Sequence, residues 1–548
     1  VAGLPEIEPV TVSGFMHRLE KSRDTLPLHD GELYLEFHRG TLTSMHDIKR
    51  NNRRAEEAMH DLEWTNVLSG KERCDETDAL YEVLLKNQFH DILPGTSIEC
   101  VNDLARREVT EIIDRAQTIA GDYLDTLTTD AENTVTAANS LSFDRNEVIT
   151  LAGKTGVVGH STQTYTAIDG KVRTAVEAAI PAFGSTVLRR TEAECTAPSP
   201  FTAGDHTLET PYYSVIFDED GYISSLIDKR VGRQVRNLRG APLGTLWLGE
   251  DVPTTYDNWE IEDDIFRRLQ PVVGKMTHRE TVSDGAVEYR IRTTYNLGKK
   301  SAIVIDTVFY AHSPRIDFVS RVDWDERHTL LKVGFDVGVR AFTVKNEIQF
   351  GYMERPTTRN TSLEAAKFEV CNHRYSDLSE SRYGVALLND CKYGISVEGG
   401  DMRLTLHKGG CHPDPTNDRG VHDMTWSLLP HTGAFSAENV VREAHAMNHP
   451  PILHEGSATV APICRVDESN ILCDTVKMAE DVENAFVLRL YECERNRTMA
   501  HITIPGACRV WRTNMLEEKI EELPMTADHT VEVAFHPFAI ETLLCERE

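Results

Sequence analysis

The stretch NQFHDILPGTSI, residues 87–98, places a histidine and an aspartate side by side where a helix has to end. Apolar residues recur at near-helical spacing from Leu80 to Phe89, which predicts an amphipathic helix. Pro94 disfavours helical geometry in the residue before it, and the glycine that follows permits a reversal. His90 and Asp91 are therefore expected at the end of a helix.

This pair of residue types can do specific chemistry. A neutral imidazole can bind a borderline metal cation through one ring nitrogen, and an adjacent carboxylate can accept hydrogen bonds from hydroxyl groups. On spacing alone, capping or packing is the commoner role of a histidine at a helix end. The wider sequence decides between these interpretations.

The NQFHD segment resembles the signature of the glycoside hydrolase family 38 α-mannosidases, in which it supplies a zinc ligand and a sugar contact. Five further segments fall in the family's order and look closest to its cytosolic and bacterial branch: GELYLEFHRGTLTS (31–44), IKRNNR (48–53), YDNWEI (256–261), NEIQFGYMERPT (346–357) and GVALLNDCKYG (384–394). The resemblance covers the chain from about Gly31 to its end. It implies that His90 is a zinc ligand and that Asp91 accepts a hydrogen bond from a mannose hydroxyl.

The family's other site residues are not recognisable. A retaining glycosidase needs two carboxyl groups about 5 to 5.5 Å apart, and the family's zinc also takes ligands from a His-x-Asp motif. No such motif precedes His90. Because one ligand cannot hold zinc, the remaining ligands are expected in an N-terminal catalytic domain of the same polypeptide. The 548 residues are then expected to be the carboxy-terminal portion of a longer chain, with no catalytic residue of their own and no activity alone.

Glu36 and His38, in LEFHRG, stand where a strand-like run meets a loop. One interpretation is that they line the sugar pocket or orient the zinc site. The other is an ion pair of Glu36 with Arg39 or Arg50. The sequence does not decide between them.

Tyr256, Asp257 and Trp259 form a second group of candidate sugar contacts. An aromatic face suits the C–H side of a sugar ring, and a carboxylate accepts from its hydroxyls. A tryptophan in a sandwich core would explain Trp259 as well. The family resemblance favours the pocket.

The periodicity of the chain changes near residue 130, from helical to short alternating runs bounded by turns. This predicts an α+β multidomain fold in which a small helical bundle is followed by antiparallel β-sandwich and super-sandwich domains. Asp220-Gly221 is expected to turn one hairpin, and Ser13 to cap a helix that follows a loop and a strand. The expected units are the tail of an α/β catalytic domain (1–45), the helical bundle (46–130), a small β domain (131–205), a β super-sandwich (206–450) and a C-terminal β domain (451–548).

Two other features have ordinary interpretations. His445 and His449 stand in an H-x-x-x-H frame, but in a region expected to be β, with no cysteine or third histidine close by, so no separate zinc site is expected there. The basic residues of the first bundle helix are expected to form a solvated charged face rather than a binding patch: Lys49, Arg50, Arg53 and Arg54.

Composition limits the partners. The net charge of −29 would repel nucleic acid and anionic lipid, and neutral or cationic ligands fit it better. No apolar run approaches the roughly 20 residues that span a membrane. Eleven scattered cysteines without a C-x-x-C pair are typical of reduced thiols in the cytoplasm. The oligomeric state, including a homo-oligomer, stays open.

The resemblance implies part of a zinc-dependent retaining α-mannosidase that hydrolyses terminal α-mannosides of glycans or oligosaccharides. The β domains would buttress the catalytic domain and close one wall of its pocket. Two alternatives stay open: a non-catalytic carbohydrate-binding or scaffold module, and another hydrolase family that shares the super-sandwich, because a fold does not fix a function.

Overall fold

The computed structural model describes residues 3, 7–194 and 196–547. The chain forms two compact units, Val1–Leu35 and Glu36–Glu548. None of the described helices is long and apolar enough to cross a membrane.

The first unit contains α1 (Val12–Glu20) and a short 3-10 turn, η1 (Arg23–Thr25). The N-cap of α1 is Thr11, whose hydroxyl accepts a hydrogen bond from the backbone N–H of Gly14 at 3.1 Å. The expectation of a strand followed by a cap at Ser13 is wrong, because residues 7–11 form no strand and Ser13 lies inside the helix.

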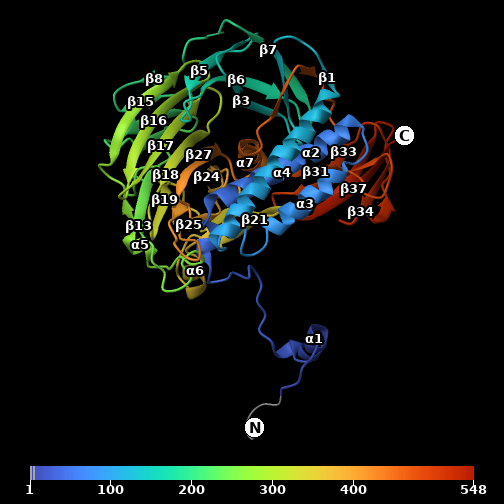
Figure 1. Ribbon diagram of the computed structural model, residues 1–548, viewed down its shortest axis with the longest axis horizontal. Helices are drawn as coiled ribbons and strands as arrows, with labels where there is room; N and C mark the ends of the chain where they lie inside the picture. The colour runs from blue at the N-terminus through green and yellow to red at the C-terminus, as the bar shows by residue number, and fades with distance from the viewer. Residues whose placement is uncertain (1–2, 4–6, 195, 548) are drawn as a thin grey trace. The chain divides into compact units, whose positions relative to one another are not determined.

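The second unit begins with a bundle of three helices, α2 (His46–Ser69), α3 (Asp75–Asn87) and α4 (Glu99–Asp125) (Figure 1). Their shared core is apolar and buried, and its members recur every three or four residues, as one face of a helix requires. These residues include Ala55, Met59, Leu62, Leu84, Ile112, Ala116 and Tyr123. The predicted bundle is therefore present.

The rest of the unit is built mainly from strands, and all strand pairings among the described residues are antiparallel. After the bundle come a four-stranded sheet, a three-stranded sheet and a two-stranded ribbon. In sheet order they are β28 (Ile452–Glu455), β2 (Thr134–Ala138), β7 (Ser185–Thr191) and β4 (Gly156–Val157); β3 (Arg145–Ala152), β6 (Val172–Ile180) and β5 (Thr162–Thr166); and β1 (Thr128–Thr129) with β29 (Ser457–Ala458).

The super-sandwich consists of a nine-stranded and a six-stranded sheet, whose inner faces meet where the Phe318 ring lies 5.4 Å from that of Phe335. The larger sheet runs β15 (Met276–Asp284), β16 (Glu288–Leu297), β17 (Ser301–Tyr310), β18 (Ile316–Trp324), β27 (Gly420–Thr432), β24 (Tyr383–Asn389), β23 (Tyr375–Ser379), β20 (Thr343–Ile348), β21 (Gly351–Pro356). The smaller runs β14 (Gln270–Pro271), β13 (Thr245–Glu250), β19 (Thr329–Asp336), β26 (Asp401–Lys408), β25 (Gly394–Glu398), β22 (Val370–Cys371).

A further five-stranded sheet contains the predicted hairpin: β12 (Arg233–Gln234), β11 (Ile223–Asp228), β10 (Tyr213–Phe217), β9 (Thr207–Glu209) and β8 (Thr202–Ala203). β10 pairs with β11, and Gly221 turns the chain between them with φ +80°, a conformation that suits glycine. The predicted Asp220-Gly221 turn is confirmed.

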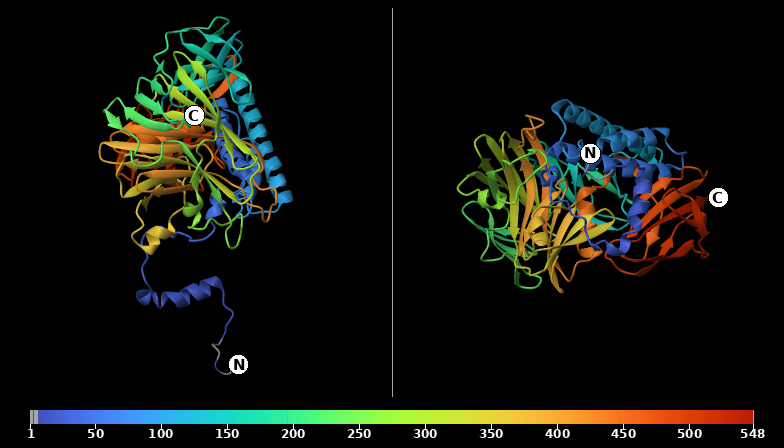
Figure 2. Two further views of the ribbon diagram at one scale, coloured as in Figure 1. Left: turned by 90° about the vertical axis from the view of Figure 1, so that its left-hand side faces the viewer. Right: turned by 90° about the horizontal axis from the view of Figure 1, so that it is seen from below.

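The C-terminal region folds into a five-stranded and a three-stranded sheet. They are β31 (Ile471–Met478), β32 (Ala485–Glu492), β37 (Ile540–Arg547), β34 (Ala507–Thr513) and β35 (Lys519–Glu522); and β30 (Arg465–Val466), β33 (Thr498–Thr503) and β36 (Thr530–Phe535). Their core also takes in Trp64 and Val67 of α2. α2 therefore lies between the super-sandwich and the C-terminal sheets, as Figure 2 shows for the blue helices between the green and yellow strands and the red ones.

Short helical segments complete the unit: η2 (Arg39–Leu42), α5 (Ile265–Arg268), α6 (Ser362–Ala366), η3 (Ala437–Val441) and α7 (Arg442–Asn448). The last two overturn the expectation that His445 and His449 lie in a β region, because η3 and α7 form a continuous helical segment that ends before Pro450. The predicted fold class, a helical bundle followed by antiparallel β sandwiches, is confirmed.

Candidate functional site

His90 and Asp91 follow the end of α3 directly, as the sequence predicts. The side chain of His90 is 75% exposed, and its Nε2 lies 3.5 Å from Oδ2 of Asp91. Oδ1 of Asp91 accepts a hydrogen bond from the hydroxyl of Thr96 at 2.8 Å. The aspartate is thus oriented from within its own turn, while the imidazole is open to solvent and to an external ligand.

A buried lysine holds the turn that follows. Nζ of Lys49 donates to the backbone carbonyls of Ser44, Leu93 and Pro94 at 2.5, 3.0 and 3.0 Å. Gly95 adopts φ +77°, and a Cβ there would lie 2.4 Å from the carbonyl oxygen of Ser44. The turn therefore packs against the start of α2 so closely that its glycine is required.

The expected solvated face on α2 is wrong for Lys49 and Arg53, which are each only 4% exposed. The Arg53 guanidinium donates to the backbone carbonyl of Asn389 at 3.1 Å and to the side chain of Asn448 at 3.0 Å. The cause is tertiary: α2 is covered on more than one side, and carbonyl and amide oxygens compensate the buried charges.

Asn258 joins the His90 turn to the second predicted group of site residues. Its side-chain amide donates to the backbone carbonyl of Gly95 at 3.2 Å, and its backbone carbonyl accepts from the hydroxyl of Ser44 at 2.7 Å. The backbone N–H of Gly40 donates to the carbonyl of Trp259 at 2.8 Å. Segments from three distant parts of the sequence are fixed together at this point.

Three of the predicted sugar contacts form a row of aromatic rings. The centroids of His38 and Tyr256 are 6.0 Å apart, and those of Tyr256 and Trp259 are 6.1 Å apart, both edge to face. Tyr256 is 63% exposed and Trp259 is half-buried in a loop. The alternative of a tryptophan in a sandwich core is therefore wrong.

The two remaining acidic candidates, Asp257 and Glu36, differ in their exposure and contacts. Oδ2 of Asp257 accepts from the backbone N–H of Cys411 at 2.5 Å, and its Oδ1 lies 3.7 Å from Nδ1 of His328. The carboxylate of Asp257 is thus partly committed to holding its own loop. Glu36 is exposed.

The carboxylate that pairs with Arg39 belongs to Glu260 and not to Glu36. The Arg39 guanidinium donates to the backbone carbonyl of Glu36, and it pairs with the carboxylate of Glu260 at 3.5 Å. Glu260 also accepts from the backbone N–H of His38 at 2.8 Å. Glu260, which the sequence analysis did not single out, therefore orients the segment that carries both candidates.

Three groups of His, Cys, Asp and Glu side chains in the described part of the chain are close enough to hold a metal ion, and none of them includes His90. They are His60, Asp61 and His449; Asp257, His328 and Cys411; and His407, Asp418 and His422. His90 can therefore offer a metal one nitrogen, with Asp91 beside it. No local spacing in the sequence would have revealed the first two groups, because each combines distant segments.

Three family models match successive parts of the chain. They are the α-mannosidase middle domain (36–127), the glycosyl hydrolases family 38 C-terminal domain (208–416) and the family 38 C-terminal β-sandwich domain (470–543). The chain thus matches, in order, a middle domain named for α-mannosidases and two C-terminal domains named for glycosyl hydrolase family 38.

Among individual proteins, the chain is 30% identical to α-mannosidase 2C1 of Homo sapiens over 99% of its own length and 53% of that protein. It is 31% identical to α-mannosidase G of Dictyostelium discoideum, over 92% and 51%. The chain spans about half the length of these relatives. The crystal structure of an α-mannosidase from Enterococcus faecalis V583 shares the fold, with a TM-score of 0.78 over 97% of this chain and 72% of that one, at 14% identity.

Proposed function

We propose that the chain is part of a zinc-dependent retaining α-mannosidase, of the family's cytosolic and bacterial branch, which hydrolyses terminal α-mannosides of glycans or oligosaccharides. The observation that carries the proposal is the junction at Asn258, because it fixes the exposed His90 turn beside the row of rings that includes Tyr256. The candidate metal ligand His90 and the candidate sugar contacts are thereby connected through one turn. The named domain matches support the same assignment.

In this proposal His90 presents a ring nitrogen to zinc, and Asp91 accepts from a mannose hydroxyl. Thr96 occupies one oxygen of Asp91, which leaves the other for the sugar. The faces of Tyr256 and Trp259 would pack against the C–H side of the sugar ring. This apolar contact, together with carboxylates that accept from the hydroxyls, would fix the orientation of the sugar. Asp257, Glu36 and His38 would complete the wall.

The donor set around His90 fits zinc only in part. Imidazole and carboxylate are zinc ligands, but a catalytic zinc normally has three protein ligands, and His90 has only Asp91 beside it among the described residues. The remaining ligands and the two catalytic carboxyl groups are proposed to come from an N-terminal catalytic domain of the same polypeptide. Bound zinc would polarise sugar hydroxyls as a Lewis acid and favour the distorted ring of the transition state.

The test is hydrolysis of p-nitrophenyl α-mannoside. The chain alone should be silent, and His90→Asn in the complete parent polypeptide should lower kcat/KM at least 100-fold. His501→Asn is the matched control, because it removes an exposed histidine that pairs only with surface carboxylates, Asp467 at 2.8 Å and Glu532 at 3.5 Å. Zinc-dependent turnover by the chain alone, or full activity of the His90 variant, would contradict the proposal.

A carbohydrate-binding module is the second candidate, because the ring row of His38, Tyr256 and Trp259 lies entirely within this chain. Calorimetry with methyl α-mannoside separates the two. Binding by the chain alone that is lost in Tyr256→Ala and unaffected by His90→Asn favours the module.

We also propose a cytoplasmic location. Five of the described cysteines are buried free thiols: Cys391, Cys464, Cys473, Cys493 and Cys545. This state is typical of a reducing compartment.

A further inference from the structure

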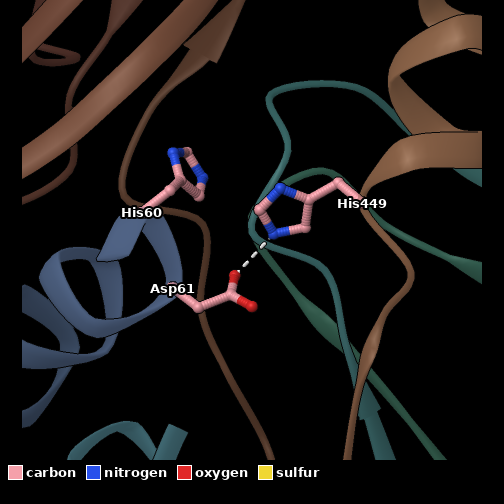
Figure 3. Close-up of side chains that lie close together, drawn as sticks. All are labelled: His60, Asp61 and His449. Carbon is pink, nitrogen blue, oxygen red and sulfur yellow. Dashed lines mark hydrogen bonds and ion pairs between the residues drawn. The ribbon is translucent and has the colours of Figure 1, made fainter. Parts of the chain in front are cut away.

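A second cluster of metal-ligand side chains lies where α2 meets the segment after α7. His60 and Asp61 stand next to each other on α2, and His449 approaches them from a part of the chain almost 400 residues away (Figure 3). One ligand atom from each residue lies within 4.8 Å of the other two. No third histidine was expected near His449, and this expectation is wrong because the fold brings His60 of α2 to 4.9 Å between ring centroids.

We propose that His60, Asp61 and His449 form a binding site for a divalent transition-metal ion, distinct from the site proposed at His90. Two imidazoles and a carboxylate are a donor set that zinc accepts, at ligand distances of about 2.0 to 2.2 Å. Ligand atoms around a tetrahedral ion lie roughly 3.3 to 3.5 Å apart at those distances. The pair formed by His449 and Asp61, at 2.7 Å, therefore has to open slightly to admit an ion, and His60 has to reach the same spacing from within 4.8 Å.

The hydrogen bonds leave His60 with a free donor atom. Its Nε2 lies 3.0 Å from the backbone carbonyl of Ser140. A carbonyl oxygen only accepts, so Nε2 carries the proton and Nδ1 keeps its lone pair. A metal bound through Nδ1 would leave the hydrogen bond to Ser140 in place.

His449 and Asp61 are already oriented toward each other. Nε2 of His449 lies 2.7 Å from Oδ1 of Asp61, and the hydroxyl of Ser140 donates to the same oxygen at 2.6 Å. Glu57 contacts the other ring nitrogen of His449. This contact matches the carboxylate that commonly supports a metal-bound histidine from behind. An ion between Asp61 and His449 would replace the proton on Nε2, so that one proton is released for each ion bound.

The cluster has room and an approach path. Its two histidines border a cavity of about 350 Å³ between α2, the turn at Leu141–Phe143 and β31. Four acidic side chains line this cavity, against the guanidinium of Arg374 and the imidazolium of His449: Glu56, Glu57, Glu63 and Asp474. A cavity with this balance of charge attracts cations.

The two other ligand groups are less suited to an ion. Beside His407 lies His46, at 5.2 Å between ring centroids, and Nζ of Lys392 sits 2.5 Å from Nδ1 of His46. A buried lysine at this point opposes a cation. In the group of Asp257, one carboxylate oxygen is taken by the backbone of Cys411.

Zinc titration of the EDTA-treated 548-residue chain tests the proposal. One equivalent should bind with a dissociation constant in the micromolar range or below, and His90→Asn should bind it equally well. His60→Asn should weaken binding at least tenfold, while His501→Asn again serves as the exposed control. No zinc binding by the native chain, or binding lost in His90→Asn and kept in His60→Asn, would overturn the proposal.

A measurement without variants covers the case in which His60→Asn does not fold. Crystals of the native chain soaked in zinc should give an anomalous peak bonded to His60 and His449. A soaked crystal with no peak at this position would overturn the proposal. The peak is independent of the mannosidase assignment, because neither ring belongs to the site proposed at His90.

Discussion

Two histidines of this chain show how differently a functional group can be encoded. His90 is 75% exposed, and its side-chain contacts are with its sequence neighbours Phe89 and Asp91. His449 is 4% exposed in its side chain and is enclosed by Glu57 and Asp61 of a distant helix. The first depends on a local motif and the second on the tertiary fold. Stability should therefore depend on His449, and activity of the parent protein on His90.

The largest expected effect on stability is that of His449→Asn. Burial opposes the charge on His449, but the carboxylates of Asp61 and Glu57 outweigh burial and raise the pKa of its imidazole to about 10, so that it is an imidazolium at neutral pH. Its removal leaves two largely buried carboxylates without their partner. The free energy of unfolding should fall by about 2 to 4 kcal/mol.

Urea unfolding of the metal-free chain at pH 7 measures this effect. His90→Asn is the control, and it should change the free energy of unfolding by less than about 0.5 kcal/mol because its side chain is exposed. Equal losses in the two variants would contradict the comparison.

Gly95→Ala should come next, with a loss of about 2 to 3 kcal/mol. The residue has φ +77°, which costs an alanine about 1 to 2 kcal/mol, and its Cβ would also meet the carbonyl of Ser44. Gly70 at the end of α2 has φ +64° with open space around it. Gly70→Ala therefore measures the backbone conformational cost alone. Thermal unfolding of both variants makes the comparison, and equal losses of stability would show that the turn at Gly95 is not tightly packed.

Asn258→Ala should cost about 1 to 2 kcal/mol, because it removes a buried amide that donates to Gly95 and accepts from Asn417 at 3.1 Å. The loss should be local. Hydrogen exchange of the backbone amides at 91–97 should become faster, whereas the exposed Asn360→Ala should leave it unchanged. Unaltered exchange in the turn would mean that Asn258 does not fix the His90 region.

The sequence predicted the elements whose causes are local. The end of α3, the Asp220-Gly221 turn and the change from helices to strands each follow from spacing, proline and glycine. The apolar spacing and Pro94 placed His90 and Asp91 at the end of a helix, and the structure has them just after α3. Their role as site residues stays a prediction.

The sequence could not predict features that require two distant segments. Lys49 and Arg53 looked like a solvated face because their carbonyl partners lie at 93–94 and 389. α7 was missed because its seven residues are too few for helical periodicity to stand out. The partners of His449 lie on α2. For the buried basic residues and for His449 a tertiary contact decides the outcome, and local propensity carries no information about it.

The smallest expected effect concerns the lysine under the His90 turn. Burial lowers the pKa of Lys49 from 10.5 to about 7. The folded chain then binds fewer protons than the unfolded chain between pH 7 and 10.5, so stability should increase as pH rises through this range and decrease as pH falls toward 7. The increase from this group should be about 1 kcal/mol between pH 7 and 8, because one pKa unit corresponds to 1.36 kcal/mol. Urea unfolding at both pH values measures it, with Lys49→Met as the control that should lack this part of the slope. If the native chain and the variant show the same pH dependence, the ammonium is stabilised by its three carbonyls as well as by water, and the turn that carries His90 is held equally firmly at either pH.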